Sequence, residues 1–164
     1  MNKEYLKEVE DKKSVIILYD SLFGNTKKVA MSINRGLEAG GLHVDTLFIQ
    51  DFDTSELKNY SIIGIGGPTH MRGLSKSMKI FLSKIKHTKL KSKKGFVFET
   101  KASFPLSGSA GRKIIRSLKK MKIEVSYPII TGIVIGKEGP LEENTLSKME
   151  EIGIDIAEKL NKRV

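Results

Sequence analysis

A run of small and polar residues follows the first hydrophobic segment of the chain. It reads Ser21-Leu22-Phe23-Gly24-Asn25-Thr26. If a helix begins there, a bound phosphate meets exposed backbone N–H groups, the positive end of the helix dipole, and the hydroxyl or amide donors of Ser21, Asn25 and Thr26. Gly24 lets the backbone approach the ligand closely. The loop therefore predicts a phosphate-binding site.

The same loop indicates which phosphate ligand to expect. It lacks the Gly-Lys-Ser or Gly-Lys-Thr ending of nucleoside triphosphate loops, and it lacks the three spaced glycines of dinucleotide sites. A monophosphate is therefore favoured. The alternative is an ordinary strand-to-helix turn, in which the polar residues only cap the helix.

The segments on either side of this loop predict the strand and the helix that it joins. Residues 15–19 are continuously apolar and rich in β-branched side chains, which is typical of a strand buried on both faces of a parallel sheet. Val29, Ile33 and Leu37 recur at four-residue spacing, and Gly40-Gly41 gives a helix stop.

The alternation of strand and helix repeats along the chain. Further strands are predicted at residues 43–49, 61–66, 95–100 and 129–135, and residues 123–127 lead into the last of them before Pro128 interrupts. A short turn or helix is expected at residues 55–59. Longer helices are expected around residues 78–85, 114–122 and 146–160, where apolar residues share one face.

Five strands alternating with helices predict an α/β fold: a five-stranded parallel sheet with helices on both faces, in three layers. We expect one domain at residues 14–164, preceded by a charged extension at residues 1–13. In such sheets ligands bind at the carboxyl ends of the strands, where the winding reverses. The loops after strands one, three and four are therefore the candidate site.

Two of these loops resemble those of a known family. Residues 21–26, which follow Tyr19-Asp20, are similar to the Thr/Ser-x-Thr-Gly-Asn-Thr phosphate loop of flavodoxins and of the flavodoxin domains of flavo-diiron proteins. Phe23 stands where many members have a hydroxyl residue, so a backbone N–H is expected to replace one side-chain contact. Gly66-Gly67-Pro68-Thr69-His70 resembles the Gly-Ser-Pro-Thr-Tyr run beside the flavin ring.

The resemblance covers residues 14–160, and it implies both a fold and a cofactor. The implied fold is flavodoxin-like, with strand order 2-1-3-4-5. The implied cofactor is one non-covalently bound flavin mononucleotide (FMN), and the implied function is electron transfer. A flavin ring needs apolar walls and backbone groups along its polar edge. The resemblance thus implies these cofactor-binding residues: Ser21, Leu22, Phe23, Gly24, Asn25, Thr26, Pro68, Thr69, His70, Met71, Gly73, Thr100, Lys101, Ser103 and Phe104.

Individual residues of this set have specific expected roles. Phe104 is the stacking candidate on one flavin face, Met71 packs on the other, and Gly73 is able to change its peptide orientation. Phe104 as a loop anchor and Met71 as core filler are the alternatives. His70 has no nearby His, Cys or carboxylate partner, so we expect a loop or flavin contact there, with no metal site and no catalytic residue.

The charge of the chain departs from that of the family, whose members are typically acidic. The net charge is +10, and residues 72–122 hold sixteen basic residues and one acidic residue, Glu99. Positive charge near a flavin lowers the cost of forming its reduced anion. We therefore expect an acidic redox partner, ferredoxin-like or a reductase, to dock near Arg72, Lys101 and Arg112. A merely solvated basic surface is the alternative.

The composition excludes several other functions. The absence of cysteine removes disulfides, thiolate metal sites and iron–sulfur clusters. No run of about 18 apolar residues is present, and the first ten residues are too charged for a secretion signal, so a cytoplasmic protein is expected. A phosphoacceptor receiver needs an Asp where Gly66-Gly67-Pro68 stands, and an acidic cluster where Asp20 stands alone.

Two alternative functions stay open. A flavin or quinone reductase that uses NAD(P)H shares the fold and the phosphate loop, and the sequence does not separate it from an electron carrier. A nucleic-acid-binding module agrees with the basic block. Because most of the phenylalanines in that block are expected to be buried, nucleic acid is not the expected partner.

Overall fold

The computed structural model describes residues 14–162, and strands alternate with helices throughout this range. The predicted extension at residues 1–13 lies outside the described residues. The strands are β1 (Ser14–Tyr19), β2 (His43–Phe48), β3 (Ile62–Pro68), β4 (Lys94–Ala102), β5 (Glu124–Val125) and β6 (Ile130–Val134). All of them pair in parallel.

The strand order confirms the prediction from the sequence. It is β2-β1-β3-β4, and both β5 and β6 then pair with β4, β5 near its start and β6 near its end. The lead-in to the predicted fifth strand is thus itself a short strand, and the fifth position of the sheet is divided in two. Pro128 lies in the gap, where a residue without a backbone N–H cannot continue the ladder.

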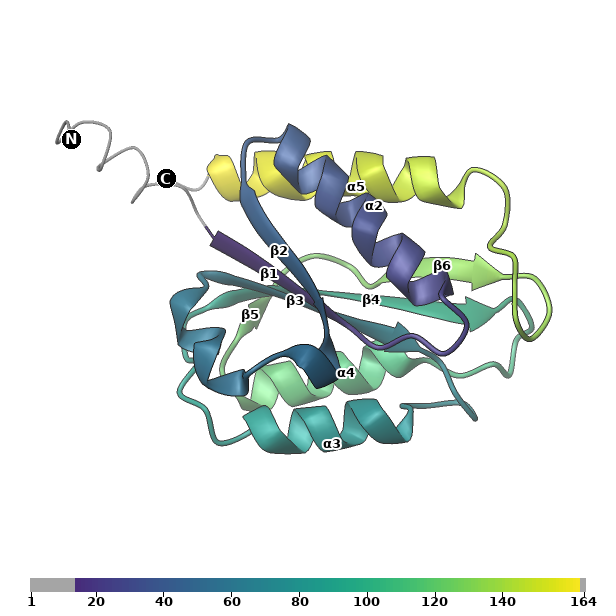
Figure 1. Cartoon of the computed structure of the whole chain (residues 1–164), viewed down its shortest axis with the longest axis horizontal. Helices are drawn as coiled ribbons and strands as arrows, with labels where there is room; N and C mark the ends of the chain where they lie inside the picture. The colour runs from purple at the N-terminus through teal and green to yellow at the C-terminus, as the bar shows by residue number, and fades with distance from the viewer. Residues whose placement is uncertain (1–13, 163–164) are drawn as a thin grey trace, which may run out of the picture.

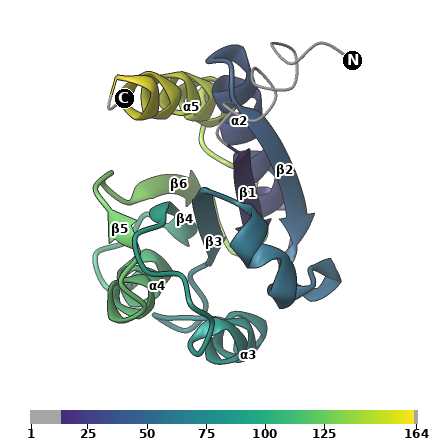
Figure 2. The same ribbon diagram turned by 90° about the vertical axis from the view of Figure 1, so that its left-hand side faces the viewer.

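Two helices cover each face of the sheet (Figure 1). On one side are α2 (Asn25–Ala39) and α5 (Thr145–Asn161), and on the other α3 (Lys76–Ile85) and α4 (Ala110–Lys120). Figure 2 shows the same three layers after a quarter turn. Two short 3₁₀ helices, η1 (Ile49–Asp51) and η2 (Thr54–Asn59), connect β2 to β3. None of the described helices is long and apolar enough to cross a membrane.

The strands bury side chains on both faces, as their continuous apolar sequences predict. In β1, Val15 and Ile17 join the core beneath α2 and α5, whereas Ile16 and Leu18 join the core above α3 and α4. All four side chains are fully buried. Alternating side chains therefore make two separate cores from one strand.

Two glycines of β3 make room for phenylalanine rings of β4. Gly64 pairs with Phe96 and Gly66 with Phe98. A Cβ on Gly64 would lie 2.3 Å from the Phe96 ring, and one on Gly66 would lie 2.2 Å from the Phe98 ring. Any side chain at these positions would displace a ring, so the glycines are required by the packing of the core.

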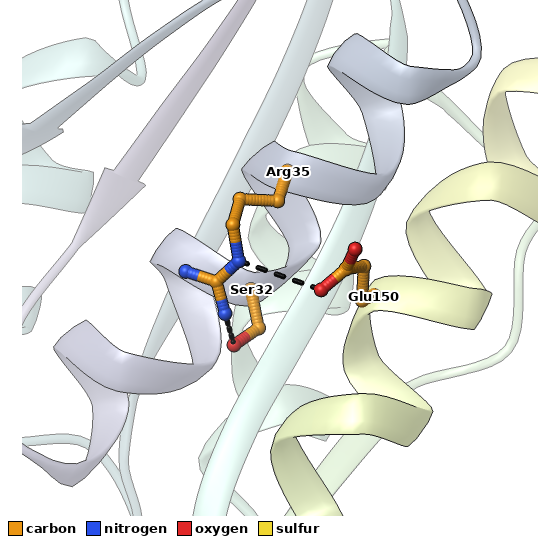
Figure 3. Close-up of polar contacts among 3 residues, drawn as sticks. All are labelled: Ser32, Arg35 and Glu150. Carbon is orange, nitrogen blue, oxygen red and sulfur yellow. Dashed lines mark hydrogen bonds and ion pairs between the residues drawn. The ribbon is translucent and has the colours of Figure 1, made fainter.

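The helices α2 and α5 also meet at glycines. A Cβ on Gly36 would lie 2.0 Å from the Glu150 carbonyl oxygen, and one on Gly153 would lie 2.4 Å from the Ile33 carbonyl oxygen. The two backbones are therefore in direct contact. Beside this crossing, Arg35 donates to the Glu150 carboxylate at 3.4 Å and to the Ser32 hydroxyl at 2.8 Å (Figure 3).

A buried carboxylate joins four elements at the carboxyl edge of the sheet. Glu99 of β4 is 3% exposed. It accepts hydrogen bonds from the Ser109 hydroxyl at 2.8 Å, the Gly111 N–H at 2.7 Å, the Thr131 hydroxyl at 3.1 Å and the Thr69 hydroxyl at 3.4 Å. Glu99 thus fixes the start of α4, the end of β3 and the start of β6 to one another.

We predict that Glu99→Ala lowers the free energy of unfolding by roughly 2–4 kcal/mol, because it leaves buried donors without an acceptor. Glu99→Gln should cost less than about 1.5 kcal/mol, since its amide oxygen still accepts from Ser109 and Gly111 while its NH₂ group donates to the Thr131 oxygen. Urea unfolding of the two variants measures both values. Glu142→Ala, at an exposed carboxylate, is the control. A loss in Glu99→Ala no larger than in this control would contradict the role of Glu99.

Candidate functional site

The loop after β1 is anchored by Asp20, which is buried. Its carboxylate accepts from the Ser21 N–H at 3.0 Å and from the hydroxyl of Ser75, the residue that caps α3. The Ser21 hydroxyl in turn accepts from the Gly24 N–H at 3.1 Å. Gly24 has φ +87°, a conformation that glycine adopts without strain. The loop therefore has a fixed shape before any ligand binds.

The first turn of α2 has the charge of an anion site. Gly24 is its N-cap and makes no side-chain cap, and the turn holds no acidic residue. Within residues 14–162, the backbone N–H groups of Asn25 and Thr26 have no acceptor. Lys27 and Lys28 follow directly and are exposed. Because the helix dipole is also positive here, this end of α2 favours a bound anion.

The side chains of Asn25 and Thr26 have protein partners. The Asn25 amide Nδ2 donates to the Glu138 carbonyl oxygen at 2.9 Å. The Thr26 hydroxyl lies 2.8 Å from the Thr100 hydroxyl, and both residues are buried. A phosphate contact from the Thr26 hydroxyl thus competes with this pair, whereas the backbone N–H groups remain available.

The loop after β3 forms a tight turn. His70 and Gly73 exchange two backbone hydrogen bonds, at 2.8 and 2.9 Å. The two residues between them, Met71 and Arg72, have φ values of 45° and 68°, which suit a type I′ turn. Gly73 therefore has its N–H and its C=O engaged in the turn.

The loop after β4 lies beside this turn. Arg72 forms a parallel bridge with Gly108, whose Cβ would lie 2.3 Å from the Arg72 carbonyl oxygen. Gly108 has φ +77°. The Thr69 N–H donates to the Thr100 carbonyl oxygen at 2.7 Å. The second and third loops are thus joined through the backbone at two places.

A cavity of about 810 Å³ opens between the loops. Most of the predicted site residues line it; they are Ser21, Leu22, Phe23, Asn25, Thr26, Pro68, Thr69, His70, Met71, Thr100, Lys101, Ser103 and Phe104. Gly24 and Gly73 do not line it, because one caps α2 and the other closes the turn. One cavity therefore brings together residues that lie up to 83 positions apart in the sequence.

A fourth loop also contributes to the cavity, and the sequence analysis did not find it. Gly136 and Lys137 follow β6, and they line the cavity together with Ala102 and Val134. The sequence did contain a signal for this loop. The fifth strand of a parallel sheet ends at the same edge as the others, so the loop after it also lies where ligands bind. Gly136-Lys137-Glu138-Gly139-Pro140 directly after that strand is a loop of the kind that binds ligands.

The lining of the cavity combines polar residues with large apolar side chains. Leu22, Phe23, Met71 and Phe104 are 51%, 50%, 89% and 58% exposed, which is unusual for large apolar side chains in a protein with a well-packed core. The exposure of Phe104 and Met71 excludes both the core-filler role and a tightly packed anchor. Apolar walls beside an anion-binding helix end fit a flat ring attached to a phosphate.

The cavity offers few groups for catalysis. Its lining residues include Lys101, Lys137 and His70 but no carboxylate. No cluster of three or more His, Cys, Asp or Glu residues that could hold a metal ion occurs in residues 14–162. The arrangement is suited to holding a ligand and gives no recognisable acid–base pair.

Comparison with known protein sequences finds two similar proteins. A flavodoxin of Clostridium saccharobutylicum is 27% identical over 124 residues, which are 75% of this chain and 76% of that protein. An uncharacterized protein of Methanocaldococcus jannaschii is 25% identical over 158 residues, but the chain spans 38% of its length.

Solved structures give the same result. A flavodoxin from the domain Archaea superposes with a TM-score of 0.76 at 26% identity, covering 90% of this chain and 99% of that one. The rubredoxin:oxygen oxidoreductase of Desulfovibrio gigas superposes with a TM-score of 0.77 at 21% identity over 98% of this chain and 39% of that one, which is a likeness of fold. The profile of the flavodoxin family matches residues 17–151. With the strand order and this match in agreement, the chain belongs to the flavodoxin family and has its fold.

Proposed function

We propose that the chain binds one FMN non-covalently in the cavity and acts as an electron carrier. The observation that carries the proposal is the cavity itself. It joins a helix N-terminus whose N-cap offers no side chain, and whose Asn25 and Thr26 N–H groups have no acceptor among residues 14–162, to exposed apolar side chains from three loops. A monophosphate attached to a flat, partly apolar ring matches both parts.

The residues of the cavity have distinct roles in this proposal. The N–H groups of Asn25 and Thr26 bind the phosphate, and the adjacent loops cover the ring. Phe104 covers one face, with Met71 along the other, and burying their exposed surface contributes to affinity. FMN, when bound, supplies the capacity to accept and release electrons. The protein orients it and sets the local charge.

We further propose an acidic redox protein as partner. Seven of the basic residues of segment 72–122 form two groups. The first group lies beside the cavity: Arg72 in the turn after β3, Lys101 near the end of β4, and Arg112 and Lys113 in the first turn of α4. The second group lies at the end of α4, at the opposite edge of the sheet, and comprises Lys119, Lys120 and Lys122. Only the first group is placed to guide a partner toward the cavity.

The test of cofactor binding is the absorbance spectrum of the purified protein. We expect a yellow protein, and heat should release FMN and not flavin adenine dinucleotide (FAD). Slow oxidation of NADH and NADPH without an added reductase would agree with an electron carrier, whereas rapid turnover would favour the alternative of a reductase. A colourless protein that FMN does not reconstitute would exclude the proposed function.

The partner proposal predicts an effect of charge reversal that depends on position. Arg72→Glu combined with Arg112→Glu should slow electron transfer from a reduced acidic ferredoxin by about ten-fold at low salt, because both charges lie beside the cavity without lining it. The difference from the wild type should shrink as salt screens these exposed charges. Stopped-flow mixing at several ionic strengths measures both effects.

The matched control is Lys120→Glu combined with Lys122→Glu. It makes the same change in net charge at the opposite edge of the sheet, and both side chains are exposed. Near physiological salt we expect less than about a two-fold change in rate, because the length of α4, about 16 Å, exceeds the Debye length of about 8 Å. At low salt we expect less slowing than in the variant beside the cavity, because these charges lie farther from it. Equal slowing by the two double variants would show that net charge alone acts, and it would contradict a docking site beside the cavity.

A further inference from the structure

The loop that joins β6 to α5 is attached to the first turn of α2. The Asn25 side chain donates to the Glu138 carbonyl oxygen at 2.9 Å. Gly139 has φ +112°, and a Cβ there would lie 2.9 Å from Asn25 Nδ2. A residue with a side chain at position 139 would therefore displace the Asn25 amide and strain its own backbone. The contact is close and requires glycine.

The loop is also closed on itself. The Ile135 N–H donates to the Pro140 carbonyl oxygen at 2.8 Å, and the Glu142 N–H donates to the Ile133 carbonyl oxygen at 2.9 Å. These bonds hold both ends of residues 135–140. Together with the Asn25 contact, they fix the backbone on either side of Lys137.

Lys137 is one of two lysines that line the cavity, and the two lie in different surroundings. Lys101 belongs to β4, next to Thr100, whose carbonyl oxygen is bonded to the loop after β3. Lys137 directly precedes Glu138, whose carbonyl oxygen is bonded to the first residue of α2. Of the two cavity lysines, Lys137 is therefore the one next to a residue that is bonded to the start of α2.

The start of α2 is positive, but the loop before it, residues 21–26, carries no charged side chain. The Ser21 hydroxyl oxygen accepts from the Gly24 and Lys27 N–H groups, Asn25 Nδ2 donates to the Glu138 carbonyl oxygen, and the Thr26 hydroxyl pairs with the Thr100 hydroxyl. Lys27 and Lys28 are exposed and do not line the cavity. Lys137, which does line it, adds a positive side chain to the unpaired N–H groups and the helix dipole. This set complements a ligand with a double negative charge more closely than it complements a neutral one.

We propose that Lys137 binds the phosphate of FMN and makes the site selective for phosphorylated flavin over riboflavin. The proposal rests on the proposed function. Asn25 is then a positioning residue, because its side chain holds the loop that carries Lys137. The exposed lysine supplies a positive charge that the uncharged side chains of residues 21–26 do not.

The test is a comparison of FMN with riboflavin, which has the same ring but no phosphate. Dissociation constants of both flavins are measured by fluorescence titration of the apoprotein for the wild type and three variants. Lys137→Gln should weaken FMN binding about ten-fold and change riboflavin binding less than two-fold. Lys137→Arg, which keeps the charge, should bind FMN nearly as the wild type does.

Lys101→Gln is the matched control, because it makes the same change of charge on another wall of the cavity. It should alter FMN and riboflavin affinity by the same factor. An equal loss of both flavins in Lys137→Gln, no loss in that variant, or an FMN-selective loss of the same size in Lys101→Gln would overturn the assignment. A wild-type protein that binds neither flavin would instead contradict the proposed function, and the role of Lys137 with it.

Discussion

The buried carboxylate of Glu99 is the constraint on which the carboxyl edge of the sheet depends. A charged group with 3% exposure is stable only if donors surround it, and here they come from the end of β3, the start of α4 and β6. No lysine or arginine of residues 14–162 forms an ion pair with it. Glu99, the one acidic residue of segment 72–122, therefore receives these hydrogen bonds from uncharged donors. These bonds hold together the strand ends and the helix start from which the cavity loops extend.

The basic residues of segment 72–122 take no part in this hydrogen-bond network and contribute positive charge to the surface. Those beside the cavity surround a site that already has the positive end of α2, and no carboxylate lines it. Such a site attracts anions and favours an anionic form of whatever it binds. The same charge that favours a bound phosphate would therefore also ease the reduction of a bound flavin. This positive charge differs from the acidic surroundings expected for the family, and it is the reason for proposing an acidic partner.

The sequence predicts the layers of this fold because continuous β-branched runs and four-residue apolar spacing are local signals, as residues 15–19 and Val29, Ile33 and Leu37 illustrate. Strand ends were less predictable: β4 extends to Ala102 because β6 pairs with it that far. The cavity residues of the loops after β1 and β3 were found through motifs, and those of the loop after β4 through its place at the carboxyl edge of the sheet. The loop of Lys137 and the partners of Asn25 and Thr26 were missed, since they depend on contacts between segments more than 70 residues apart.

The central claim is that one helix end and the adjacent loops together form an FMN site. A crystal structure of the protein grown with FMN tests it most directly. The account predicts a phosphate bound by the N–H groups of Asn25 and Thr26, with Lys137 in contact, and a ring between the loops of Met71 and Phe104. Crystals that contain FMN bound elsewhere, or a phosphate away from the first turn of α2, would contradict it.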